Sequence, residues 1–441
     1  MLRSLRSLGA RVAVLLLLLA VTAAVHAARA MRRLVGAQRA AGGASPKRLL
    51  IAGTFYNAGW FRAHIRPLAE CRAIERIVVV CDEPLFEVHK VTYATPPVWL
   101  VRVCGRVLAR AIWMGVAIRR ARPDVLMGYH IMPNALLCLL YARLTGAAAL
   151  YQMTGGPVQL SGGGNGSENV LLRELGKPSR WREALLFHLV RQFDGVVVRG
   201  QKAADFVRAH RLSRSCAVIP GSVDCGEFYP ANGEPREYDL VCVGRLVPVK
   251  RHDRLLALVA ALKALRPQVR VAIVGDGPLL ESTRRRAVEL GLADHVQFLG
   301  RREDVSAILR RARALVMTSE NEGLSIALIE ALACGLPVFA PHVGDLAELL
   351  SHGRNGAFID VTDPAGAARV IASILDDPPR WTEMSAAARR TAVERVSVAN
   401  VAHKWEAVFG NGVLDPAAKR AVVGPTSPQT RTSKACPWHP A

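Results

Sequence analysis

The stretch Ser319-Glu-Asn-Glu-Gly-Leu-Ser-Ile-Ala-Leu-Ile-Glu330, which continues to Ala340 as Ala-Leu-Ala-Cys-Gly-Leu-Pro-Val-Phe-Ala, decides the fold. An apolar run at residues 314–317 precedes it and is typical of a buried parallel strand. A small, acidic loop follows, then an apolar helix, Gly335 and a second short strand. This order is that of one unit of a doubly wound α/β sheet.

Glu322 and Glu330 stand at the centre of this unit. On one helix they would lie about 80° apart and roughly 12 Å apart along the axis, so they would not pair closely. Gly323 and Ser325 favour a helix start near Ser325, which leaves Glu322 in the loop. A helix N-terminus favours an anion, and acids beside an anion site suit hydroxyl groups. From spacing alone two interpretations stay open: a nucleotide-sugar site, or a solvated acidic loop with one surface glutamate.

The composition predicts two domains and an anionic partner. The chain has 441 residues, half of them hydrophobic, and a formal charge of +22. Such a charge suits nucleic acid, an anionic membrane or phosphorylated substrates. The aromatic residues are scattered, so we expect no nucleic-acid partner. The nine cysteines are dispersed and form no CxxC pair, so we expect buried thiols, a reducing compartment and no metal site.

The N-terminus combines positive charge with an apolar stretch, residues 12–25. Arginines stand on both sides of this stretch: Arg3, Arg6, Arg11, Arg29, Arg32 and Arg33. Three alternatives stay open: a signal peptide, a short anchor beside anionic lipid, and a true start at Met31. We favour an anchor or a spurious extension over secretion. The expected location is the cytoplasm, in association with the inner face of the membrane.

Strand-like and helix-like segments alternate along the chain. In the first half the strand-like segments are residues 47–53, 76–81, 98–103, 124–127, 148–152, 195–199 and 217–220. A polar bridge at residues 231–238 precedes a restart of the pattern at residue 239. We predict an N-terminal segment 1–46, a first Rossmann-like domain 47–232 and a second 233–395. A terminal helix 396–410 that crosses back and a disordered tail 411–441 would follow.

Two glycine-containing loops follow strands of the second half. Gly244-Arg-Leu-Val-Pro-Val-Lys250 places two cations, Arg245 and Lys250, where both can reach a diphosphate. The alternative is two solvated cations of a basic protein. Gly275-Asp-Gly277-Pro is weak evidence by itself and also fits a plain turn.

These blocks together resemble glycosyltransferase family 4 (glycosyl transferases group 1), the retaining enzymes with the GT-B fold. The resemblance is carried, in order, by Gly244-Arg-Leu-x3-Lys250, Val274-Gly-Asp-Gly-Pro278, Val296-x-Phe-x-Gly300, Glu322-Gly-Leu-Ser-x4-Glu330-Ala-x-Ala-x-Gly335-x-Pro337-Val338, Gly344-Asp-Leu-x-Glu348 and Gly353-x-Asn-Gly356. The first half matches more loosely, through Pro123-Asp-Val-x4-His130 and Ile219-Pro-Gly-Ser-Val-Asp224-x3-Phe228.

The resemblance implies a nucleotide-diphospho-sugar donor and no cofactor or metal. Arg245 and Lys250 would hold the diphosphate, Glu330 the ribose hydroxyls and Glu322 the hydroxyls of the transferred sugar. His130 would line the reacting face. The remaining implied donor-binding residues are Gly59, Gly244, Gly275, Gly277, Arg301, Gly323, Leu324 and Ser325.

The chain departs from the family pattern at three places. Many members have Gly after the donor lysine, where this chain has Arg251. Many have a histidine in the loop after the strand that ends near Gln152, where this chain has Thr154-Gly-Gly-Pro. The first-strand loop, Gly53 to Gly59, lacks the usual pair of glycines. These departures concern the acceptor side more than the donor side.

The expected activity is transfer of a sugar, with retention, to a sugar, glycan or glycolipid hydroxyl. Two alternatives remain: a nucleotide-sugar epimerase or phosphorylase of the same fold, and a non-catalytic sugar-nucleotide-binding module. The donor sugar, the base and the acceptor do not follow from these residues.

Overall fold

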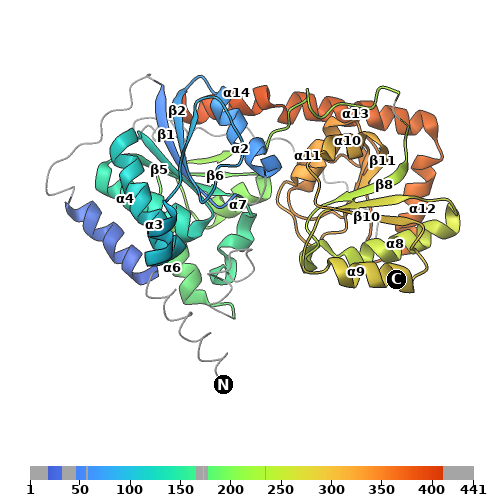
Figure 1. Cartoon of the computed structure of the whole chain (residues 1–441), viewed down its shortest axis with the longest axis horizontal. Coiled ribbons are helices and arrows are strands. Elements are labelled where there is room, and N and C mark those ends of the chain that lie inside the picture. Colours follow the sequence, from blue (N-terminus) through green and yellow to red (C-terminus); the bar gives the residue numbers. More distant parts are fainter. Residues whose placement is uncertain are drawn as a thin grey trace.

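The computed structural model describes residues 18–31, 46–55, 58–164, 172, 177–233 and 235–410. Figure 1 shows two α/β units side by side, each a sheet with helices on its faces. The predicted tail, residues 411–441, lies outside the described residues, as do residues 1–17 and 32–45 of the predicted N-terminal segment.

The first sheet has seven parallel strands in the order β3-β2-β1-β4-β5-β6-β7. Its strands are β1 (Lys47–Ala52), β2 (Ile74–Val80), β3 (Val91–Ala94), β4 (Val125–Tyr129), β5 (Ala148–Met153), β6 (Gly195–Val198) and β7 (Cys216–Val218). The helices of this unit are α2 (Ala58–Glu70), α3 (Val98–Ala121), α4 (Leu136–Thr145), α6 (Arg180–Val190) and α7 (Gln201–Ala209).

The second sheet has six parallel strands in the order β10-β9-β8-β11-β12-β13. Its strands are β8 (Tyr238–Val243), β9 (Val271–Val274), β10 (Val296–Gly300), β11 (Ala312–Val316), β12 (Val338–Ala340) and β13 (Gly356–Phe358). Its helices are α8 (His252–Leu265), α9 (Leu280–Glu289), α10 (Val305–Arg310), α11 (Ile326–Ala333), α12 (Pro364–Leu375) and α13 (Pro378–Val396).

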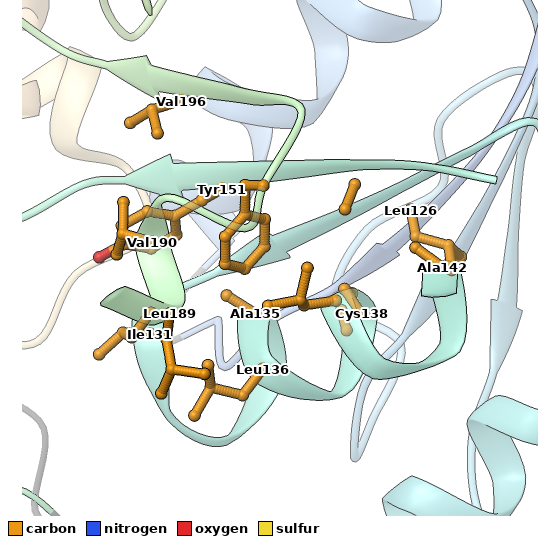
Figure 2. Close-up of a cluster of buried hydrophobic side chains, with 14 of the residues drawn as sticks. Leu126, Ile131, Ala135, Leu136, Cys138, Ala142, Tyr151, Leu189, Val190 and Val196 are labelled. Atoms are coloured by element: carbon orange, nitrogen blue, oxygen red, sulfur yellow. The ribbon is translucent and has the colours of Figure 1, made fainter. Parts of the chain in front are cut away.

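The central strands are apolar on both faces because helices cover both faces of each sheet. Leu50 and Ile51 of β1 point to opposite faces, and both are buried. Figure 2 shows one such layer, in which Ala135, just before α4, and Leu136 and Cys138 of α4 pack in one cluster with Leu126 and Tyr151 of the sheet. This close packing fixes where the strands end, and hence where the loops of the site begin.

One predicted strand is wrong. Residues 98–103 are the first turns of α3, and the edge strand β3 lies earlier, at Val91–Ala94, paired with β2. The apolar, β-branched run suggested a strand, but Arg102, Arg106 and Arg110 recur at the four-residue spacing of a helix. Pro97 stands at the N-cap of α3.

The apolar N-terminal stretch continues into a helix, residues 18–31, that packs on the first unit. Leu18, Val21 and Val25 are buried in the same core as α4 and α6. Arg29 donates a hydrogen bond to Gln192 at 2.6 Å. No helix within the described residues is both long and apolar enough to cross a bilayer.

The last helix, α14 (Val398–Gly410), returns from the second unit to the first, as Figure 1 shows. Its Trp405 and Val401 are buried in the core formed by β1, β2 and α2. Lys202 and Gln201, at the N-terminus of α7, donate backbone hydrogen bonds to Asp345 (3.1 Å) and Glu348 (2.8 Å) of the second unit. The helix α14 and the N-terminus of α7 therefore both join the two units.

Candidate functional site

The strand orders locate the site. In the first sheet the order reverses between β1 and β4, and in the second between β8 and β11. Open α/β sheets form a crevice at the carboxyl ends of such strands. The loops after β8 and β11 carry Lys250 and Glu322, and the loop after β4 carries His130.

The N-terminus of α11 lies at this crevice. The helix begins at Ile326, and Ser325 is its N-cap residue with an extended backbone and no side-chain capping bond. The first backbone N–H groups of α11 therefore stay available for an anion. The Leu324 side chain is buried and holds the loop down. A Cβ on Gly323 would lie 3.1 Å from the carbonyl oxygen of Thr154, so this loop meets the first unit.

Lys250 and Glu322 are in direct contact. Lys250 Nζ donates to Glu322 Oε1 at 2.6 Å, and Ser319 Oγ donates to the same oxygen at 2.6 Å. An ammonium group has three donors, so Lys250 keeps further N–H groups for a ligand. The second carboxylate oxygen of Glu322 stays available as an acceptor in the same way. The pair thus places a cation that could bind a phosphate beside an acid that could accept hydrogen bonds from hydroxyl groups.

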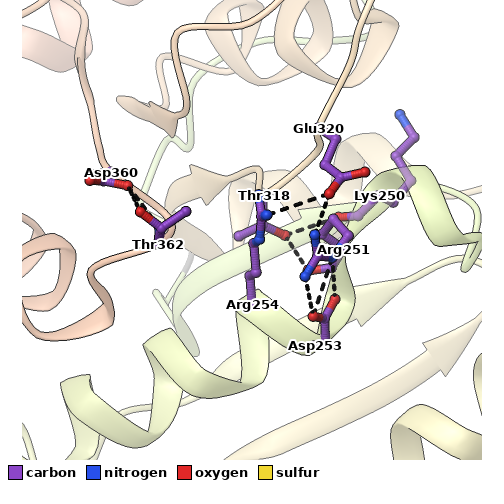
Figure 3. A network of polar contacts seen from close by, with 8 residues as sticks. All are labelled: Lys250, Arg251, Asp253, Arg254, Thr318, Glu320, Asp360 and Thr362. Carbon is purple, nitrogen blue, oxygen red and sulfur yellow. Dashed lines mark hydrogen bonds and ion pairs between the residues drawn. The ribbon is translucent and has the colours of Figure 1, made fainter.

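Arg251, the departure from the family pattern, has a backbone explanation. Its φ is 51°, in the left-handed region that favours glycine. Its guanidinium pairs with Asp253 and Glu320 (Figure 3). Thr318 Oγ1 donates to the carbonyl oxygens of residues 250 and 251, at 3.1 Å each, and so ties the turn to the end of β11. Figure 3 shows the Lys250 side chain pointing away from this network.

The glycines of the second unit allow close backbone approach. A Cβ on Gly275 would lie 1.8 Å from the carbonyl oxygen of Gly244, and one on Gly277 would lie 2.5 Å from that of Leu246. The loops after β8 and β9 therefore stack directly on each other. Arg245 and Arg301 are exposed at the ends of β8 and β10.

Glu330 and Gly59 line one small pocket, although they belong to different units. The pocket has a volume of about 30 Å³, the share of one water molecule in the liquid. Burial and, to a lesser extent, the Glu227 carboxylate raise the pKa of Glu330 to about 8, while Arg62 opposes the shift. A hydroxyl ligand at Glu330 would need the two units to separate slightly.

His130 follows β4 and faces the loop after β5. Its φ is 60°, and its Nδ1 lies 3.1 Å from Gln159 Nε2 and 3.3 Å from Thr154 Oγ1. Its ring stacks on Trp60, with the centroids 6.2 Å apart. Burial lowers the pKa of His130 to about 4, so the ring is neutral near pH 7. A histidine is therefore held beside the loop where many family members carry one, but it comes from the neighbouring strand.

Sequence reasoning missed Arg199, which follows β6 at the same edge of the sheet. The side chain is 5% exposed, and its Nε and Nη2 atoms are buried without a hydrogen-bond partner. Burial lowers its pKa to about 10, and Tyr129, Asp345 and Glu322 oppose this shift. A Cβ on Gly221 would lie 2.8 Å from Nη2, so this glycine leaves space for the guanidinium. A lone arginine after a strand carried no motif that would have singled it out.

The structure brings together Lys250 with Glu322, Gly59 with Glu330, and Gly323 with the loop beside His130. Arg301 follows Gly300, whose carbonyl oxygen accepts a hydrogen bond from Gly275 N at 2.8 Å. Within the described residues, no group of three or more His, Cys, Asp or Glu side chains is placed to hold a metal ion.

Residues 228–391 match the sequence model of the glycosyl transferases group 1. The chain is 34% identical over 210 residues to a GDP-mannose-dependent alpha-(1-6)-phosphatidylinositol monomannoside mannosyltransferase of Mycolicibacterium smegmatis, which covers 43% of this chain and 54% of that protein. It is 35% identical over 215 residues to a D-inositol 3-phosphate glycosyltransferase of Streptomyces avermitilis, with coverages of 44% and 46%. The chain spans about half the length of the curated relatives it matches.

Solved structures share the fold. Anabaena HepE in complex with UDP and glucose superposes with a TM-score of 0.63 at 19% identity, over 83% of this chain and all (100%) of that one. WaaG, a glycosyltransferase involved in lipopolysaccharide biosynthesis, gives a TM-score of 0.62 at 19% identity, over 82% and 100%. The chain therefore has the GT-B fold of two Rossmann-like domains, and its residues 228–391 are similar in sequence to the glycosyl transferases group 1.

Proposed function

We propose that the protein is a retaining glycosyltransferase that moves a sugar from a nucleotide-diphospho-sugar to a hydroxyl group. The observation that carries the proposal is the contact between Lys250 and Glu322, at the N-terminus of α11 and facing the first domain. It combines a cation, an acid and a helix N-terminus within one small volume. A diphosphate flanked by sugar hydroxyls has the complementary groups.

The donor would bind along the second domain. Its diphosphate would lie on the α11 N-terminus between Lys250 and Arg245, with Gly323 and Ser325 supplying backbone N–H groups. Glu322 would accept hydrogen bonds from the transferred sugar, and Glu330 from the ribose. Gly59 would let the backbone approach from the first domain.

In the proposed reaction the bond between the anomeric carbon and the diphosphate oxygen breaks, and the sugar passes through an oxocarbenium-like state. The acceptor oxygen bonds the anomeric carbon on the same face, and its proton goes to the departing diphosphate. Lys250 and Arg245 stabilise the charge that develops on the leaving group. Neutral His130 lines the reacting face. No side chain acts as a nucleophile, so catalysis rests on charge stabilisation and positioning.

The cations at residues 245 and 250 would perform the task that a divalent metal performs in other transferases. Activity is therefore expected to persist in the presence of a chelator such as EDTA. Loss of activity on chelation, with recovery on adding Mg²⁺ or Mn²⁺, would contradict this part of the proposal.

The relatives suggest the class of acceptor. Their names give a phosphatidylinositol monomannoside and an inositol 3-phosphate as acceptors. We propose a lipid-linked or polyol acceptor and a cytoplasmic site of action at the membrane, within glycolipid or polysaccharide synthesis.

The experiment is an assay with labelled UDP- and GDP-sugars, with and without an extract of membrane lipids as acceptor. Release of nucleoside diphosphate that needs the extract, together with label in the lipid fraction, supports transfer. The product should keep the α-configuration of the donor by NMR. Release without acceptor, or a changed sugar, would indicate a phosphorylase or epimerase. Nucleotide binding without turnover would indicate a binding module.

A further inference from the structure

The outward face of α3 is apolar. Large exposed apolar side chains cluster on this helix more than on any other described one: Val98, Trp99, Val103, Val107, Leu108 and Ile112. Val103 is 79% exposed and Trp99 64% exposed. The other exposed large apolar side chains are scattered between Leu19 and Val393. A face of this kind marks a site of interaction.

The charge on α3 has a single sign. The helix contains five arginines and no aspartate or glutamate. Arg110 points inward, where it pairs with Asp82 at 2.6 Å and Asn134 at 2.9 Å. The other four are exposed and pair with no described acid: Arg102, Arg106, Arg119 and Arg120. The apolar face thus has positive charge along it, and no acid of the described residues forms an ion pair with these four arginines.

A pocket of about 280 Å³ opens beside the second half of α3, against β2 and β3. Trp113, Tyr93, Arg76 and Arg120 line it, and both of these arginines are exposed. Its lining is aromatic and apolar inside and cationic at the edge. A phosphate-bearing headgroup next to an acyl chain has the matching chemistry.

The helix α3 is interrupted near its middle. Gly105 has φ 77° and ψ 163°, so the helix consists of two segments joined at that residue. The exposed apolar side chains come from both segments, on either side of the join. The helix of residues 18–31 uses its own apolar side chains Leu18, Val21 and Val25 against α4 and α6.

We propose that the outward face of α3 is a docking surface for an anionic lipid bilayer. Tryptophan and aliphatic side chains would enter the boundary between headgroups and acyl chains, while the four exposed arginines contact lipid phosphates. A protein partner of matching size would need many acids opposite the arginines, whereas a bilayer supplies negative charge over any area. The proposal concerns binding and does not depend on the transferase activity.

The test is co-sedimentation of the full chain with vesicles of phosphatidylcholine alone, or with about one third phosphatidylglycerol added. The unaltered protein should bind the anionic vesicles, and added salt should weaken the binding. Trp99→Ser with Val103→Ser, and separately Arg102→Glu with Arg106→Glu, should each weaken binding by at least about tenfold. Val288→Ser, at an exposed apolar position of α9 in the second domain, is the control and should bind as the unaltered protein does.

A second measurement isolates α3 from any contribution of the N-terminal segment. Vesicles with brominated acyl chains should quench the tryptophan fluorescence of the unaltered protein, and Trp99→Phe should remove most of that quenching. Trp381→Phe, in α13, should leave the quenching as it was. The proposal would be overturned if the Trp99→Phe variant were quenched as much as the unaltered protein, or if both double variants bound anionic vesicles as tightly as the unaltered protein. Absence of binding to anionic vesicles would overturn it as well.

Discussion

At the residue scale, two charged or titratable side chains of the crevice, Arg199 and Glu330, are buried in a way that a polar ligand would satisfy. The Arg199 guanidinium is buried with two donors unsatisfied, and Glu330 is held with a raised pKa. Lys250 and Glu322 were predictable, since they stand at fixed spacings within motifs. Arg199 was not, because only the fold brings the end of β6 to the same edge as Glu322.

Arg199→Met tests whether this buried cation serves a ligand. Burying an unpaired charge costs folding free energy, so the apolar variant should melt at the same temperature or higher. The same change should weaken binding of UDP or GDP by about 10- to 100-fold, the worth of a charge-assisted hydrogen bond. Melting temperatures with and without nucleotide give both quantities. A lower melting temperature with unchanged nucleotide affinity would show that Arg199 is structural.

Glu330→Gln tests the environment of the proposed ribose-binding acid. The folded-state pKa is about 8, above the value of 4.5 in an unfolded chain. The folded protein therefore keeps a proton that the unfolded chain loses, and Glu330 makes stability fall as pH rises from 4.5 to 8. The melting temperature of the variant should therefore rise relative to that of the unaltered protein as the pH increases over this range. Parallel curves would place Glu330 in water.

The effect of His130 on the pH dependence of stability is opposite to that of Glu330. Burial lowers its folded pKa to about 4, so below pH 6.5 the unfolded chain binds a proton that the folded protein does not. Its contribution makes stability fall as pH drops from 6.5 to 4. His130→Gln should reduce this acid sensitivity and lower turnover, and melting curves between pH 4 and 7 measure the first effect. An unchanged acid profile would contradict the neutral, enclosed ring.

At the element scale, short loops set the geometry of the site. Gly344 has φ 55°, and a Cβ there would lie 1.7 Å from the carbonyl oxygen of Glu322. The Gly344-Asp-Leu-x-Glu348 block therefore supports the loop that carries Glu322. Its place in the motif was predictable, but its contact was not, because the contact joins two loops through the fold.

Gly344→Ala should displace Glu322, lower the stability of the fold and lower turnover by at least about tenfold. Gly353→Ala is the matched control, since Gly353 also has a positive φ, 76°, but open space around it. That variant should lose only about 1 kcal/mol from backbone strain and keep its turnover. Urea unfolding and the transfer assay separate the two effects. Equal behaviour of the two variants would mean that Gly344 has no special role.

Residues 98–103, predicted as a strand, form the first turns of α3. Composition favoured a strand, while the arginine spacing and the preceding prolines favoured a helix. The same alternation of exposed apolar residues and arginines that obscured the element now marks the outward face of α3. The parallel strands of the second domain were easier to predict, because each is a short apolar run bounded by glycine or a polar loop.

At the scale of the whole molecule, the contacts between the domains include α14 on the first domain, and Asp345 with Glu348 on the α7 N-terminus. Asp345→Ala with Glu348→Ala should loosen the second contact and increase the radius of gyration measured by small-angle X-ray scattering. Asp363→Ala with Asp377→Ala is the control, because these acids cap α12 and α13 within one domain. A double variant as compact as the control would show that the contact of Asp345 and Glu348 with α7 does not set the distance between the domains.

The central claim is that Lys250, held by Glu322, binds the donor diphosphate and stabilises the leaving group. The most direct measurement is acceptor-dependent release of nucleoside diphosphate by the unaltered protein, by Lys250→Ala and by the control Lys263→Ala. The Lys263 side chain lies half-buried on α8, where its Nζ donates to Gly291 O. Lys250→Ala should fold normally by circular dichroism and lose about 100- to 1,000-fold in turnover, while Lys263→Ala keeps full activity. Near-normal turnover in Lys250→Ala would contradict the account.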